Sequence, residues 1–133
     1  MSLTVAGFRA TGESRATAKK MTAQKVRNVE TILGTVDDPK LPRACCDLIL
    51  LVDVYHEFSE PQKMLRKIRE ALKPDGRLVL LEFRKEDPKI PIRLEHKMSV
   101  AEVRLELEAE DYRFDQAIEK LPWQHILVFR MKT

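Results

Sequence analysis

The chain has 133 residues with 24 Lys+Arg and 21 Asp+Glu, a formal net charge of +3, and this length fits one domain. It contains only four glycines, and no two of them stand in a G-x-G or G-x-x-G spacing, which excludes a dinucleotide fingerprint and a phosphate-binding loop. Its longest apolar run, Leu48 to Val52, is far shorter than the roughly 20 residues that span a bilayer, so we expect a soluble protein without a membrane partner.

The first third of the chain predicts two short strands around one helix. Leu3 to Phe8 is short and apolar and predicts a strand, and the Ala/Lys/Met/Gln-rich stretch from Glu13 to about Val26 favours a helix. Asn28 to Leu33 alternates and contains β-branched residues, which indicates a strand that Gly34 ends. Thr35 to Arg43, with two prolines and two acids, is expected to form a loop.

The middle of the chain has the pattern of a strand, a helix and a second strand. Asp47 to Asp53 is a continuous apolar run typical of a strand buried on both faces of a parallel sheet. Ser59 is expected to cap the following helix, with Gln62 in the capping-box position. Lys73 to Gly76 (KPDG) ends the helix, and Arg77 to Phe83 predicts the second strand. Short connections between these elements predict a parallel crossover unit, and therefore an α/β fold.

The C-terminal third predicts one helix and a hairpin. A helical turn is expected around Ile92 to Lys97, and Ser99 with Glu102 has the spacing of a capping box at the start of a helix. Tyr112 to Ile118 and Gln124 to about Phe129 predict two strands close enough to form an antiparallel hairpin at the end of the sheet. Residues 1–133 are therefore interpreted as a single domain.

The cysteines and the basic N-terminal region allow two further inferences. Cys45 and Cys46 are adjacent, a spacing that supports neither an ordinary disulfide nor a metal knuckle. We interpret them as reduced thiols in a cytoplasmic protein. Residues 1 to 33 hold 6 basic and 2 acidic groups, which suits either a nucleic-acid contact or a solvated helix face. Because no aromatic residue separates Lys19, Lys20 and Lys25, we favour the helix face and expect no nucleic-acid partner.

Five segments in series carry a resemblance to a known family. The sequence resembles the C-terminal part of class I S-adenosylmethionine-dependent methyltransferases, and above all the small type-11 group that includes quinone-biosynthesis C-methyltransferases. The resemblance implies a partial Rossmann-like sheet, mostly parallel with a C-terminal antiparallel hairpin. The matching segments are Asn28 to Gly34, Asp37 to Pro42, Asp47 to Phe58 (DLILLVDVYHEF), Leu72 to Glu82 (LKPDGRLVLLE) and His96 to Ser99.

The resemblance also implies the positions of cofactor and acceptor. In this family the loop after the third strand presents an acid to the adenine amino group of S-adenosyl-L-methionine, which points to Asp37 or Asp38. A carboxylate suits this role because it accepts hydrogen bonds from an amino group.

The mouth for methyl transfer is expected where the buried strands end, as open α/β sheets bind ligands at the carboxyl ends of their strands. By resemblance, Asp53, Tyr55 and His56 lie there as candidate base or orienting groups, and Glu82 and Arg84 flank the mouth. Methyl transfer is an in-line displacement, so a base is needed only if the acceptor must lose a proton.

Two departures from the family fall on cofactor binding. The sequence contains no glycine-rich loop, and Arg9 stands where the family's second strand ends in an acid for the ribose hydroxyls. We therefore interpret the chain as an incomplete methyltransferase domain, truncated at the N-terminus. Two functions remain. In the first, the chain transfers a methyl group to an unknown small-molecule acceptor after another chain or a second copy completes the site. In the second, it is a catalytically inactive module that binds or regulates a partner.

Metal binding is a minor alternative at the same mouth. His96 and His125 can approach it if the final helix and hairpin fold back, forming a polar rim or, with Glu57, a metal site. No short histidine spacing of a known metal motif is present, so the sequence predicts no metal site.

Overall fold

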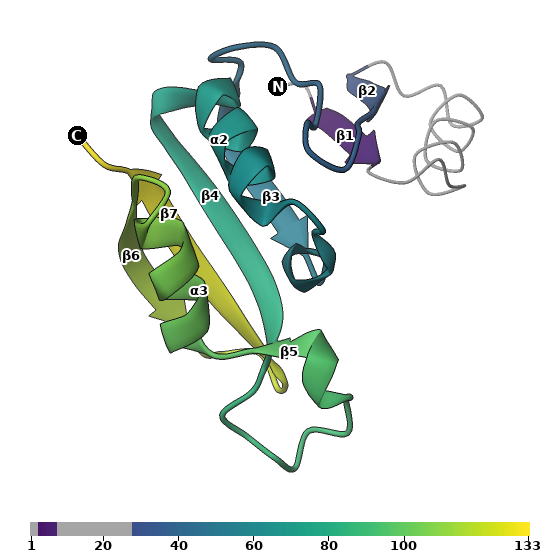
Figure 1. Ribbon diagram of the computed structural model, residues 1–133, viewed down its shortest axis with the longest axis vertical. Helices are drawn as coiled ribbons and strands as arrows, with labels where there is room; N and C mark the ends of the chain where they lie inside the picture. Colours follow the sequence, from purple (N-terminus) through teal and green to yellow (C-terminus); the bar gives the residue numbers. More distant parts are fainter. Residues whose placement is uncertain (1–2, 8–27) are drawn as a thin grey trace.

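The computed structural model describes residues 3–7 and 28–133, which form two sheets (Figure 1). In the first sheet, β1 (Leu3–Gly7) pairs in parallel with β2 (Val29–Leu33). The second has the order β3-β4-β7-β6, and β5 pairs with the end of β4. The bounds of these strands are Cys46–Val52 for β3, Leu72–Arg84 for β4, Lys97–Met98 for β5, Tyr112–Ile118 for β6 and Gln124–Met131 for β7. The expected helix from Glu13 to Val26 and the position of Arg9 lie outside the described residues.

Two α-helices lie on one face of the larger sheet, α2 (Pro61–Ala71) and α3 (Val100–Glu108) (Figure 1). Two short 3-10 turns lie near the strand ends, η1 (Tyr55–Glu57) between β3 and α2, and η2 (Leu94–His96) directly before β5. No helix among the described residues is long and apolar enough to cross a membrane.

The core lies between these helices and the sheet. Alternate residues of β4 point into it, so Leu78, Leu80 and Glu82 are fully buried, and the helices contribute Met64, Leu65, Ile68, Val103 and Leu107. Strands β3 and β4 are parallel and connected through α2, whereas β6 and β7 form an antiparallel pair. The predicted crossover unit and hairpin, and with them the α/β class and its mostly parallel sheet with a C-terminal hairpin, are confirmed.

The opposite face of the sheet is apolar and open. Leu48, Leu50 and Val52 of β3 point to it, and each is about half exposed. The outer edge of β3 pairs with no other strand in the part of the chain that the structure describes. Within residues 3–7 and 28–133, these features form an open apolar surface, which we call the outer face, so the expectation that this strand is buried on both faces is wrong.

The segment from Lys73 to Gly76, predicted to form a turn before the second strand, lies within β4 as a bulge in one long strand. The ladder between β3 and β4 shifts register after the pair Cys46–Leu72 and resumes at Leu48–Arg77. A Cβ atom on Gly76 would lie 2.9 Å from the Lys73 carbonyl oxygen and 3.1 Å from that of Cys46. Glycine is needed at this position because the backbones approach so closely.

The two predicted helix caps have different outcomes. Ser99 caps α3 as predicted, since its hydroxyl accepts a hydrogen bond of 3.0 Å from the Glu102 backbone N–H. The predicted cap at Ser59 is wrong, because α2 begins two residues later at Pro61 and its N-cap is Glu60, without a side-chain cap. Proline is preorganised for the first helical position and fixes the start of the helix there.

This difference predicts unequal effects of the same substitution. Ser99→Ala should lower the free energy of unfolding by about 1 kcal/mol, because an N-cap hydrogen bond is lost. The exposed Ser59 provides the matched control, and Ser59→Ala should change stability by less than about 0.5 kcal/mol. Urea unfolding measures both changes, and equal losses in the two variants would contradict the assignment of the caps.

Candidate functional site

The candidate site lies where β3 and β4 end side by side. Asp53 directly follows β3, and its backbone N–H donates a 2.8 Å hydrogen bond to the Leu81 carbonyl of β4. Its backbone has a φ of 54°, in the left-handed region that residues other than glycine seldom adopt. Such backbone strain persists only where the surrounding structure imposes it, and it is common at functional sites. The strained turn directs the chain from β3 into η1.

The centre of the site is a pair formed by His56 and Glu82. Glu82 is fully buried at the end of β4 and accepts hydrogen bonds from both the backbone N–H and Nδ1 of His56, at 3.2 and 2.8 Å. Burial raises the pKa of Glu82 above its usual value. The hydrogen bonds from His56 and its charge act in the opposite direction but are weaker than the effect of burial. The carboxylate fixes the imidazole ring, so that Nε2 is directed away from Glu82, toward His96.

Asp53 lies beside this pair, and one oxygen of its carboxylate lacks a hydrogen-bond partner in the described part of the chain. Its Oδ1 is buried and makes no hydrogen bond to any described residue, although His56 Nδ1 lies 3.8 Å away. Burial raises the pKa of Asp53, opposed by the charge of His56. Buried polar atoms are nearly always paired, so an unpaired carboxylate oxygen here is suited to accept a hydrogen bond from a ligand.

Tyr55 belongs to the core as much as to the site. It is buried, and its hydroxyl donates a 3.4 Å hydrogen bond to Glu106 of α3. Burial, followed by the charge of Glu106, raises the pKa of Tyr55 far above its usual value. The phenol therefore stays protonated at neutral pH, and its available role is that of a hydrogen-bond donor that orients neighbouring groups.

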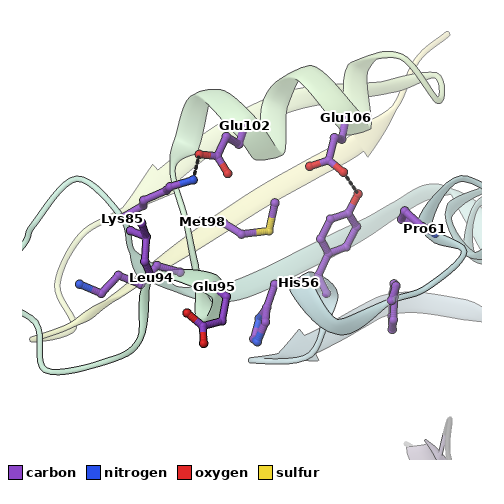
Figure 2. A pocket seen from close by; sticks show the side chains of 11 residues that line it. His56, Pro61, Lys85, Leu94, Glu95, Met98, Glu102 and Glu106 are labelled. Atoms are coloured by element: carbon purple, nitrogen blue, oxygen red, sulfur yellow. Dashed lines mark hydrogen bonds and ion pairs between the residues drawn. The ribbon is translucent and has the colours of Figure 1, made fainter.

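A cavity of about 300 Å³ opens beside His56. In Figure 2 charged side chains surround it, including Lys85, which donates a 2.6 Å hydrogen bond to Glu102. Glu106, on the same side of α3, also lines the cavity, and burial raises its pKa. Glu106 was not predicted as a site residue, although its spacing of four from Glu102 places both acids on one helix edge.

The structure does not join Asp37 and Asp38 to this cluster. They follow β2, where Asp37 accepts a 2.8 Å hydrogen bond from the Thr35 hydroxyl and Asp38 accepts one of 2.8 Å from the Lys40 backbone N–H. Asp38 lines a different cavity from that beside His56. The two acids are thus held in a turn whose carboxylates retain further acceptor capacity.

Arg84 and His125, expected near the mouth, lie instead in a network with the hairpin. Arg84 donates to Glu119 and to the carbonyl oxygens of Leu121, Pro122 and Gln124. The structure thus assigns Arg84 to holding the loop between β6 and β7.

The buried His125 lies between two carboxylates of the same network. Its Nδ1 contacts Glu119, and its Nε2 lies 2.9 Å from Glu86. Burial alone would raise the pKa values of Glu86 and Glu119. Hydrogen bonds from the Val100 N–H and His125 to Glu86, and from Arg84 and His125 to Glu119, outweigh burial and hold both pKa values below the usual range.

This network predicts how stability falls in acid. A carboxyl group whose pKa is lowered by folding stabilises the protein above its unfolded pKa of about 4.3, and that contribution is lost as the pH falls through the folded pKa. The double variant Glu86→Gln/Glu119→Gln should therefore show a shallower fall in unfolding free energy between about pH 5 and pH 3. Urea unfolding across this range tests it, with Glu60→Gln as an exposed control. Parallel pH profiles for the double variant and the unchanged chain would refute it.

The family model described as a methyltransferase domain matches residues 2–80. No curated protein matches the sequence. The structure of a SAM-dependent methyltransferase from Aquifex aeolicus is similar with a TM-score of 0.87 and 23% identity, covering 96% of this chain and 68% of the other.

Two further solved structures extend the comparison. A protein from Sulfolobus solfataricus described as a type 11 methyltransferase is similar with a TM-score of 0.70 and 23% identity, over 91% of this chain and 69% of its own. An O-methyltransferase from neocarzinostatin biosynthesis, solved with S-adenosyl-L-homocysteine and 1,4-dihydroxy-2-naphthoic acid, has a TM-score of 0.81 and 17% identity. The match covers 98% of this chain and 42% of the O-methyltransferase. These likenesses establish the fold.

Proposed function

The chain belongs to the methyltransferase-domain family, and we propose that it supplies the acceptor side of an S-adenosyl-L-methionine-dependent methyl transfer to a small molecule. The proposal rests on one observation: a histidine held by a fully buried carboxylate lines a cavity at the strand ends. Open α/β sheets bind their ligands at this edge. We propose that residues 1–133 act as one incomplete methyltransferase-like domain.

Asp53 is the residue that best fits the cofactor. When bound, S-adenosyl-L-methionine supplies an electrophilic methyl group on a sulfonium. Its amino acid part carries an ammonium group, and the unpaired, buried Oδ1 of Asp53 is an acceptor suited to it. By family resemblance, we assign contact with the adenine amino group to Asp37 or Asp38, whose carboxylates keep free acceptor positions.

His56 is the proposed base. Glu82 accepts from Nδ1 and fixes the ring, so Nε2 is the nitrogen that can take a proton from the acceptor once the acceptor replaces its 3.2 Å contact with His96 Nδ1. Tyr55 stays protonated and orients the site through Glu106. A base is needed only for an acceptor that loses a proton, so this pair favours acceptors with an ionisable O–H or N–H group.

Calorimetric titration with S-adenosyl-L-homocysteine tests the proposal. Saturable binding to the unchanged chain is expected, and Asp53→Asn should weaken it by about tenfold or more because a charged acceptor is lost. The Glu60→Gln variant, changed at the exposed N-cap of α2, serves as the control. No heat of binding at millimolar ligand would overturn the assignment of cofactor contacts to Asp53 and to Asp37 or Asp38.

A second candidate function is a catalytically inactive module that binds or regulates a partner. The observation that favours it is the separation of β1 and β2 from the larger sheet, with no strand joining the two sheets among the described residues. The same titration discriminates the two functions, since an inactive module of this kind would not bind the cofactor product.

We propose further that a second copy of this chain covers the outer face. The edge of β3 and the exposed Leu48, Leu50 and Val52 would otherwise leave backbone groups and apolar side chains in water. Packing the outer faces of two copies against each other about a twofold axis would bury these apolar side chains, and pairing of two β3 edges would supply partners for the backbone groups. A separate completing chain is the alternative occupant.

Light scattering tests this association. A dimer is expected, and Leu50→Asp should convert it to a monomer because a charge would be buried at the centre of the interface. A stable, folded monomer of the unchanged chain would overturn the homodimer.

We propose a cytoplasmic location for the protein, where its free cysteines stay reduced.

A further inference from the structure

Two histidines that lie far apart in the sequence meet at the mouth of the site. His56 Nε2 and His96 Nδ1 are 3.2 Å apart, and their ring centroids are 5.3 Å apart at an interplanar angle of 72°. The short strand β5 produces this contact. It pairs Lys97 with Phe83, next to Glu82, and so brings the preceding His96 to the end of β4.

A carboxylate completes the cluster. Glu57 Oε1 lies 4.0 Å from His56 Nε2, and ligand atoms of His56, Glu57 and His96 lie within 4.8 Å of one another. A tetrahedral zinc ion with bonds near 2.0 to 2.1 Å separates its ligand atoms by about 3.3 Å. The two imidazole nitrogens, 3.2 Å apart, already have this separation. The carboxylate oxygen of Glu57, on a partly exposed side chain, is 4.0 Å from His56 Nε2 and would come to the same separation by a small movement.

The hydrogen bonding around His56 also suits a ligand. Histidines that bind metals usually donate their second ring nitrogen to a carboxylate, which fixes the tautomer and orients the ring. Glu82 holds His56 Nδ1 in this way at 2.8 Å and is itself fully buried. The lone pair of Nε2 is therefore directed toward the point between His96 and Glu57.

We propose that His56, His96 and Glu57 bind one divalent transition-metal ion, with Zn²⁺ as the best match, and that Glu82 is the positioning residue for this site. Two imidazoles and one carboxylate suit zinc and leave a fourth position open. This inference does not depend on methyl transfer. An ion at this place occupies the Nε2 lone pair assigned above to the base, so metal binding and proton abstraction by His56 exclude each other.

Direct titration of tag-free protein with Zn²⁺ tests the site. Cys45 and Cys46 should first be changed to serine, because their adjacent thiols offer a competing place for zinc. Calorimetry is expected to show one ion per chain, and His96→Ala should weaken binding at least tenfold. Glu57→Gln should weaken it as well, whereas Glu95→Gln, an exposed acid beside His96, should leave it unchanged.

Three outcomes of the zinc titration would overturn the proposed metal site. Absence of binding, or binding that His96→Ala leaves unaltered in a chain of unchanged circular dichroism, would overturn it. Equal weakening by Glu95→Gln would do the same, since it would indicate diffuse attraction to surface acids. Glu82→Gln provides the second readout. It should lower affinity by about 10- to 100-fold without removing a ligand, and unchanged affinity would remove Glu82 from the site.

Discussion

Leu51→Ala is expected to lower the free energy of unfolding by about 2 to 5 kcal/mol, because a buried leucine loses its packing and leaves a cavity. Leu51 is 4% exposed on β3 and points into the core beneath α2, where its pairing partner is Leu80 of β4. Chemical unfolding followed by circular dichroism measures the change.

The neighbouring Leu50 is a matched control on the same strand. It points to the outer face and is 51% exposed, so Leu50→Ala in a monomer should cost less than about 1 kcal/mol. If a second copy covers this face, the cost of Leu50→Ala should depend on protein concentration. Equal and concentration-independent losses for the two variants would contradict the assignment of faces.

His56→Asn is expected to lower the rate of methyl transfer by about 10²- to 10⁴-fold, the usual contribution of a general base. Transfer of a labelled methyl group from S-adenosyl-L-methionine to an acceptor found by screening measures the rate. The affinity for S-adenosyl-L-homocysteine should stay unchanged, because His56 is assigned to the acceptor.

Two outcomes would contradict this role of His56. An unchanged rate would exclude the base, and a parallel loss of cofactor affinity would assign the residue to cofactor binding instead. Glu60→Gln, at the exposed N-cap of α2, is the control that should retain the full rate. Metal-free buffer keeps the Nε2 lone pair available during the measurement.

The sequence predicted the fold where the pattern is continuous. The apolar runs of β3 and β4 and the short connections of α2 were enough to predict a parallel crossover unit. The capping spacing of Ser99 predicted the start of α3 correctly. The start of α2 was misplaced because two signals compete there, and the fixed φ of Pro61 decides between them over the side chain of Ser59.

The site was predictable only in part. Its place at the strand ends follows from the topology, and Asp53, Tyr55 and His56 do lie together there. The partners of these residues were harder to predict. His96 reaches His56 through β5, a strand of two residues that has no periodicity to detect. Arg84 points toward the hairpin, where it donates hydrogen bonds to carbonyl groups of the loop between β6 and β7. These acceptors come close to Arg84 only in the tertiary structure, so the sequence did not indicate them.

The central position of β4 has a consequence for how the chain is made. One edge of β4 pairs with β3, which precedes it closely, but the other pairs with β7, which begins only at Gln124. At ribosomal rates of about 5 to 20 residues per second, that second edge stays open for seconds after β4 is synthesised. A nascent chain halted before Gln124 would present an unpaired apolar strand to chaperones and to other nascent chains.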